Sequence, residues 1–209
     1  LSTVIFPRIS KYCMDSDYGM LRSILRYSFK ILVFILLPYL LLVIAYSQDI
    51  IALLYERGAF NAASTRLTAT AFLCYSFAVV GYACQEIFNR VYYALKKFKT
   101  PMYASLLCLL LHLVLNLLLF KQLGIAGLAL STSAALMLYA LIMGLMVYRV
   151  IGSFLGTGFW KYLLRLGLPL GGMLLCIVAG KEFLPPGLWT SFLLPLGLSG
   201  LFYLLLAWL

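Results

Sequence analysis

The chain has 209 residues, of which 65% are hydrophobic and 11% charged, and its mean hydropathy is +1.05. So much apolar surface excludes an ordinary soluble domain and predicts a polytopic membrane protein, in which helices satisfy the backbone within lipid. The apolar runs are continuous rather than alternating, which argues against a barrel. In a soluble protein the net charge of +10 would indicate nucleic-acid binding. Here we assign the charge to loops on the inner side of a membrane and expect no nucleic-acid partner.

The first 30 residues lead into the membrane. Residues 1–6 resemble the last turns of a helix whose beginning is missing, so we expect the chain to be the C-terminal part of a longer protein. From Leu21 onward, apolar residues fall on one helical face, and the opposite face carries Arg22, Arg26 and Lys30. This pattern is typical of an amphipathic segment lying at the lipid interface.

Membrane-length apolar runs follow in chain order. They predict helices over residues 31–46, 67–88, 102–120, 125–148, 162–179 and 189–209. Pro38 is expected to kink the first of these helices, and a loop over 47–65 should follow it. Gly124 and Gly127 begin a run of small residues and are expected to let helices approach closely.

A basic elbow over residues 89–101 fixes the expected topology. It carries Arg90 and three lysines but no acidic residue, which is typical of a short cytoplasmic loop between two membrane helices. Pro101 suits the first turn of the helix that follows. With the elbow inside, most of the 16 lysine and arginine residues fall on the cytoplasmic side. The exceptions are Arg57, Arg66, Lys121 and Lys181.

These features predict an all-α polytopic membrane protein with three parts. Residues 1–150 should form the later part of a transmembrane bundle, with the end of one helix and four full helices. Residues 151–161 should form a flexible, glycine-rich cytoplasmic linker. Residues 162–209 should form a final transmembrane hairpin.

Polar residues at bilayer depth are the candidate functional residues, because they are costly in lipid. Glu86 and Arg90 lie four residues apart and can pair along one helical face. They are either a snorkelling arginine with a stabilising partner or a contact to a substrate head group or gate. Arg57, in the loop after the first span, is either part of a solvated turn or a further site residue.

His112 and Asn116 also lie four residues apart, in the middle of an apolar span. One interpretation is a hydrogen bond that locks two helices together. The alternative is a role in sensing protons or ions, since histidine is the side chain that titrates near neutral pH. The sequence contains no catalytic constellation, clustered metal ligands or phosphate-binding loop. We therefore expect neither enzymatic activity nor a cofactor, with coupling to the membrane potential or an ion gradient as the energy source.

Three motifs, in this order and spacing, resemble the MurJ/MviN family of lipid II flippases in the MOP transporter superfamily. Residues 54–60 read L-Y-E-R-G-A-F, residues 92–101 contain Y-Y-A-L followed by T-P, and residues 116–133 contain N-L-L-L followed by L-G-I-A-G-L-A-L-S-T-S. The family patterns are L-F-x-R-G-A-F, F-Y-A-L…T-P and N-L-L-L…L-G-x-A-G-L-A-L-A-T-S. The resemblance covers most of residues 7–148.

The resemblance implies the second half of a fourteen-helix transporter in the bacterial inner membrane. Family members move lipid II, the lipid-linked peptidoglycan precursor, from the inner to the outer leaflet by alternating access. Lipid II, membrane lipids and cell-wall synthesis proteins are the implied partners. Arg90 falls where the family often has arginine, whereas Glu86 falls where a lysine is expected. The alternatives are another MOP-type exporter, of a lipid-linked oligosaccharide or a drug, and a non-transporting membrane scaffold.

Overall fold

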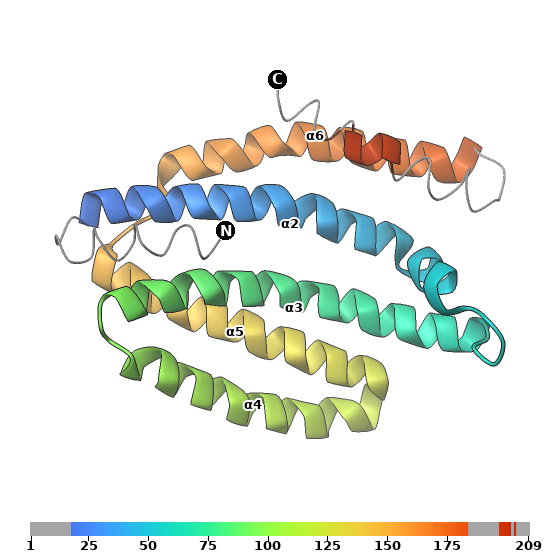
Figure 1. The fold of residues 1–209 in the computed structure, drawn as a ribbon, viewed down its shortest axis with the longest axis horizontal. Coiled ribbons are helices and arrows are strands. Elements are labelled where there is room, and N and C mark those ends of the chain that lie inside the picture. The colour runs from blue at the N-terminus through green and yellow to red at the C-terminus, as the bar shows by residue number, and fades with distance from the viewer. Residues whose placement is uncertain (1–17, 184–196, 202, 204–209) are drawn as a thin grey trace. The chain divides into compact units, whose positions relative to one another are not determined.

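The computed structural model describes residues 18–183, 197–201 and 203, and these residues are almost entirely helical (Figure 1). The helices are α2 (Tyr18–Tyr55), α3 (Ala62–Ala94), α4 (Lys99–Leu123), α5 (Ile125–Ile151) and α6 (Gly156–Phe183). All five are long and apolar enough to cross a membrane. The predicted all-α polytopic fold is thereby confirmed. The expected helix end at 1–6, and most of the last predicted span, lie outside the described residues.

The chain packs into two compact units. The first unit comprises Leu1–Phe29 and Thr70–Gly156, and the second comprises Lys30–Ala69 and Thr157–Leu209. The boundaries therefore pass through α2 and α3. The division into a bundle, a linker and a hairpin stays a prediction, although the non-helical part of the linker is only residues 152–155.

The start of α2 was expected to be a separate segment at the lipid interface, and the structure does not confirm this. It is continuous with the rest of α2, and Leu21 and Leu25 are both fully buried within the first unit. Ser28, one turn further along the same face, is also buried. The apolar face of this segment is therefore buried within protein rather than in lipid.

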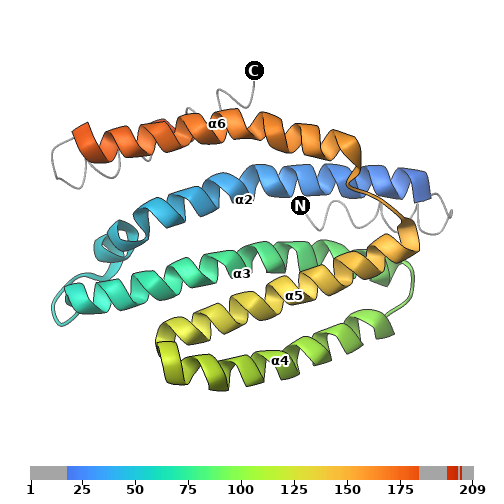
Figure 2. The ribbon, with the colours of Figure 1, turned by 180° about the vertical axis from the view of Figure 1, so that it is seen from behind.

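The helices α4 and α5 form a tight antiparallel hairpin in the first unit (Figure 2). Gly124 alone joins them, with φ +59°, a conformation that glycine adopts without strain. A Cβ at Gly124 would meet nothing, so its predicted role in close packing is wrong and its role is the turn. At Gly127 the prediction is confirmed, because a Cβ there would overlap the carbonyl group of Leu119.

Every fourth residue of α5 from Gly127 to Ile151 is buried, and the side chains of this buried stripe become larger along the helix. The members of the stripe are Gly127, Ser131, Ala135, Tyr139, Met143, Val147 and Ile151. The three small residues lie nearest the Gly124 turn, and the four larger ones follow toward the linker. Gly81 of α3 also lies against the backbone of Leu136, near the small half of the stripe. The helix backbones therefore approach most closely near that turn, as small residues permit in a bilayer.

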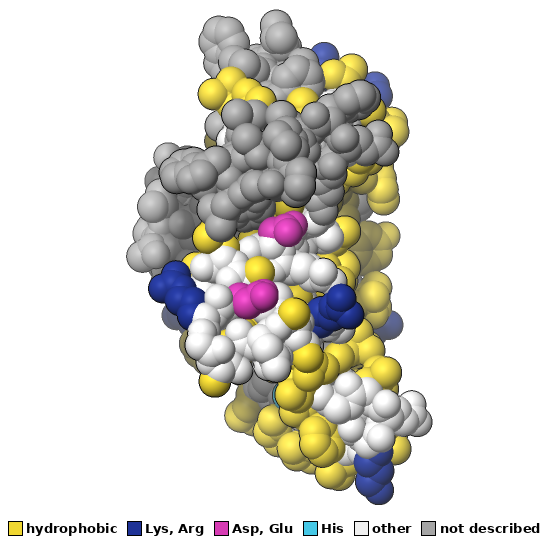
Figure 3. All heavy atoms as spheres, turned by 90° about the vertical axis from the view of Figure 1, so that its right-hand side faces the viewer, with side chains coloured by type: hydrophobic (Ala, Val, Ile, Leu, Met, Phe, Trp, Pro, Cys, Tyr) yellow, Lys and Arg dark blue, Asp and Glu magenta, His cyan; other side chains and the backbone are white. Residues whose placement is uncertain are grey.

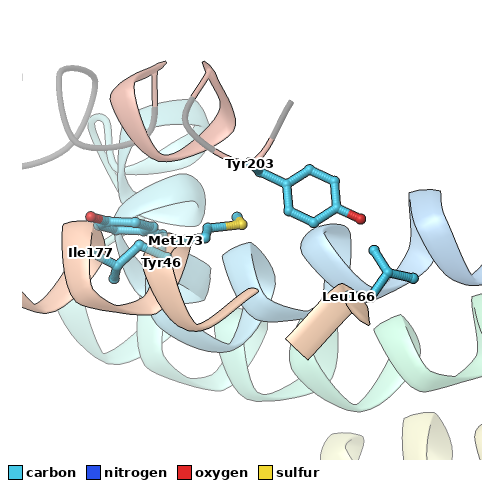
Figure 4. Packing of buried hydrophobic residues seen from close by; sticks show 5 residues of the cluster. All are labelled: Tyr46, Leu166, Met173, Ile177 and Tyr203. Carbon is cyan, nitrogen blue, oxygen red and sulfur yellow. The ribbon is translucent and has the colours of Figure 1, made fainter. Parts of the chain in front are cut away.

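In the second unit, α2 continues through much of the expected 47–65 loop. Tyr46 has non-helical angles (φ −125°, ψ 17°), and helix resumes as far as Tyr55. The apolar stretch 50–55 was too short to span a membrane alone, but it extends an existing helix. Tyr46 belongs to a buried cluster with side chains of α6 and the last described residues (Figure 4). The other members are Leu166, Met173, Ile177 and Tyr203.

Pro38 lies inside α2 and has no N–H to donate. In a regular helix that N–H would bond the carbonyl oxygen four residues earlier, which belongs to Phe34. The hydroxyl of Tyr203 donates to this oxygen at 2.8 Å, and the rings of Phe34 and Tyr203 lie 5.2 Å apart. A side chain close to the C-terminus thus satisfies the backbone group that the proline leaves open.

Candidate functional site

A polar cluster joins α4 to α5 within the first unit. The Nε2 atom of His112 lies 3.1 Å from the hydroxyl of Thr132 and 3.2 Å from the amide nitrogen of Asn116. Ser131 donates to the amide oxygen of Asn116. The predicted pair His112 and Asn116 therefore shares one face of α4, and it contacts α5 as the packing interpretation expects.

The cluster has two proton arrangements. Ser131 fixes the amide oxygen of Asn116, so the amide NH2 group faces His112 and donates to Nε2 when that nitrogen is unprotonated. When Nε2 carries the proton, it donates to the hydroxyl of Thr132, which itself donates to the carbonyl of Leu128 at 2.9 Å. A change of tautomer at His112 therefore exchanges a bond within α4 for one between α4 and α5.

An open cavity of about 210 Å³ lies beside this cluster, between α3, α4 and α5. Its lining is mostly apolar and consists of Gln85, Ser105, Cys108, Leu109, His112, Thr132, Ala135, Leu136 and Tyr139. The side-chain oxygen of Gln85 is buried and accepts no hydrogen bond from the described residues. The volume is below the ~300 Å³ typical of sites for drug-sized ligands, so the cavity is too small for a lipid-linked sugar.

Glu86 and Arg90 form the ion pair that their spacing predicted. The guanidinium and carboxylate lie 3.3 Å apart, and the side chains are 25% exposed for Arg90 and 38% exposed for Glu86. Next to Arg90 in sequence, Asn89 accepts a hydrogen bond from Tyr139 at 2.6 Å. The end of α3 thus presents an ion pair and a polar link to α5. The role of the pair in a substrate path stays a prediction.

Arg57 belongs to the second unit, in the turn between α2 and α3, and is exposed. Its neighbour Glu56 accepts a hydrogen bond from the hydroxyl of Thr65 at 2.8 Å, and the side chain of Asn61 caps α3 by accepting from Ser64 N–H at 3.0 Å. In the view onto this end of α2, acidic and basic side chains both appear (Figure 3). These hydrogen bonds therefore hold the loop in place, and the side chain of Arg57 remains exposed on its surface.

Sequence reasoning did not single out Gln85 or the arginines at the start of α2. Arg22 and Arg26 hydrogen-bond the backbone between α5 and α6. The only signal was their spacing of four residues, which was interpreted as the polar face of an interfacial segment. Gln85 carries no charge and has no partner at helical spacing, so no pattern marked it.

Membrane-length helices, two of them joined by a polar cluster, define a multi-pass helical membrane protein. The model of the family described as "Lipid II flippase MurJ" matches residues 1–198. The chain belongs to this family.

Relatives of known name agree with this assignment. A "Probable lipid II flippase MurJ" from Treponema pallidum is 32% identical over 149 residues, which cover 71% of this chain and 28% of the relative. A "Lipid II flippase MurJ" from Thermosipho africanus is 30% identical over 135 residues, covering 65% and 27%. A solved structure, "Lipid II flippase MurJ, inward closed conformation", matches 99% of this chain and 41% of its own, with a TM-score of 0.79 and 25% identity. The chain thus spans little more than a quarter of the curated relatives.

Proposed function

We propose that this chain works as the C-terminal part of a transporter that flips lipid II from the inner to the outer leaflet of the bacterial cytoplasmic membrane. The observation that carries the proposal is the family match over residues 1–198. The likeness in fold to a solved lipid II flippase, over 99% of the chain, supports it.

The proposed cycle is alternating access, with lipid II as substrate and with membrane lipids and cell-wall synthesis proteins as partners. The protein acts as a transporter rather than an enzyme and uses no cofactor. Coupling to the membrane potential or to an ion gradient supplies the energy. The cluster around His112 supports such coupling, because the hydrogen-bond partner of its Nε2 atom depends on whether that nitrogen carries a proton.

Four residues are proposed for the substrate path or its gating. Arg90 is proposed as a positively charged contact for the substrate or as a gate. Glu86 would partly neutralise that charge, because the two side chains form an ion pair. Asn116 is proposed to hold α4 against α5 through Ser131. Arg57 is proposed as a contact on the opposite side of the membrane from Arg90, since it is exposed just before the start of α3 and Arg90 lies near the end of that helix.

The test uses the full-length gene in a host depleted of its own lipid II flippase. The amount of lipid II exposed on the outer leaflet is measured with and without expression. Restored exposure is the expected result, and ionophores that collapse the potential or an ion gradient should reduce it. Correctly inserted protein that restores no exposure would refute the proposal and favour another lipid-linked substrate or a scaffold role.

A further inference from the structure

Two arginines on α2 hold the backbone that connects α5 to α6. The Nε–H group of Arg22 donates to the carbonyl of Ile151 at 2.5 Å, and that of Arg26 donates to the carbonyl of Phe154 at 3.1 Å. The carbonyl of Ile151 belongs to the last residue of α5, where no further turn of helix supplies a donor. Arg22 therefore caps α5, and Arg26 binds the connection three residues later.

The glycines of this segment fit the guanidinium groups. Gly152 has φ +85° and Gly156 has φ +25°. A Cβ at Gly152 would lie 3.0 Å from Nη2 of Arg22, and a Cβ at Gly156 would lie 3.0 Å from Nη2 of Arg26. Each arginine thus lies against a glycine whose missing side chain leaves room for it, and both glycines adopt angles unfavourable for other residues.

An aromatic anchor lies between the two glycines. Phe154 is buried, and its ring centroid lies 5.5 Å from that of Phe29 and 6.1 Å from that of Phe88. The rings of Phe29 and Phe88 lie 5.3 Å apart. Two hydrogen bonds, two fitted glycines and one buried ring therefore hold a segment whose glycine content predicted flexibility.

We propose that Arg22 and Arg26 are positioning residues that clip the 152–155 connection to α2. The cytoplasmic-side end of α2, the end of α5 and the first residue of α6 then move as one body, and the glycines are not a free hinge. Resting on the proposed function, this clip would carry movement of α2 and α5 to α6 during lipid II transport. All the residues that form the clip belong to the first unit.

The clip is tested with a nitroxide label on Ser153→Cys, an exposed position within the connection, in full-length protein without its native cysteines. Spectra are recorded for the parent and for the Arg22→Ala/Arg26→Ala double variant. The expected result is an immobilised label in the parent and a several-fold shorter rotational correlation time in the double variant, within the nanosecond range of loop motion. Arg149→Ala is the matched control, because it removes an exposed cation from the last turn of α5 without touching the clip.

Glycine variants test the same clip without changing charge. Gly152→Ala and Gly156→Ala should each mobilise the label, whereas Gly158→Ala should not, because a Cβ there meets nothing within 4 Å. Arg22→Lys/Arg26→Lys should also mobilise it, since lysine keeps the charge but lacks both the Nε–H group that bonds the carbonyl and the flat guanidinium that lies against the glycine. A label that is equally mobile in the parent and the double alanine variant would overturn the clip, as would full immobilisation in the lysine pair.

A transport measurement separates the clip from the proposed function. In the depleted host, the double alanine variant should expose less lipid II than the parent, and Arg149→Ala should match the parent. A mobilised label with undiminished exposure would overturn the positioning role in transport. A parent that restores no exposure would instead refute the proposed function, while the label still reports on the clip.

Discussion

The link between Pro38 and Tyr203 offers a sharp test of the second unit. Replacing Tyr203 by Phe keeps the ring against Phe34 but removes the hydroxyl that donates to the carbonyl of Phe34. A buried carbonyl left without a donor costs about 1–3 kcal/mol in general. Hydrogen bonds between membrane helices average only ~0.6 kcal/mol, with a maximum near 1.7. We therefore expect Tyr203→Phe to lower the free energy of unfolding by about 1 kcal/mol.

The same substitution should cost much less in a Pro38→Ala background. The alanine supplies the missing N–H, so the carbonyl of Phe34 gains a donor within α2. The difference between the two costs is the coupling energy, which we expect to be about 1 kcal/mol. Unfolding by SDS in mixed micelles, followed by circular dichroism, measures all four proteins of the cycle.

Tyr162→Phe provides the matched control. Its hydroxyl also donates to a carbonyl of α2, that of Lys30, but at 3.4 Å. The carbonyl of Lys30 already has a donor four residues later in the helix, Phe34 N–H. Its loss should be small and independent of Pro38. Equal costs for Tyr203→Phe with and without Pro38 would refute the reasoning.

Three further substitutions test the first unit. Gly127→Ala should destabilise the folded protein by about 1–3 kcal/mol, because its Cβ would overlap the backbone of α4, whereas Gly171→Ala, with open space around it, should be nearly neutral in the same SDS titration. Asn116→Ala should cost about 1 kcal/mol through loss of the bond to α5, and an unchanged SDS midpoint would contradict the proposed lock. Arg90→Ala should reduce lipid II exposure in the depleted host while membrane insertion stays intact, with Lys121→Ala as an exposed-cation control. Normal transport by the Arg90 variant would remove that residue from the substrate path.

The features that could be predicted from the sequence depend on one helix, or on two helices that are adjacent in sequence. The α4–α5 hairpin followed from two apolar runs separated by a short break at residues 121–124, although α4 continues to Leu123 and the turn is Gly124 alone. The pairs Glu86–Arg90 and His112–Asn116 followed from helical spacing, because residues four apart share a face whatever the rest of the fold does. Their place in a transport path did not follow, since spacing along one helix says nothing of what that face contacts.

Contacts between distant segments were not predictable in the same way. An arginine on a polar helical face looks the same whether it meets water, a lipid phosphate or a carbonyl 129 positions away, as Arg22 does. The glycines at 152 and 156 predicted a flexible linker, because glycine content indicates how freely the backbone can move. It does not indicate which side chains pack against that backbone. The extension of α2 beyond Tyr46 could not be predicted for a related reason, since residues 50–55 are too few to span a membrane unless they continue another helix.

The one-residue turn at Gly124 bears on how the protein is made. The residues of α4 and α5 that contact one another are close in sequence, so the hairpin can assemble while the chain is still on the ribosome. The bonds of Arg22 and Arg26 join positions 129 and 128 residues apart, and they cannot close until α5 and the following connection have been synthesised. During synthesis the start of α2 therefore cannot form these two bonds until α3, α4 and α5 have been made. Crosslinking of ribosome-bound chains should detect the α4–α5 contact before that of α2, and the reverse order would contradict this sequence of assembly.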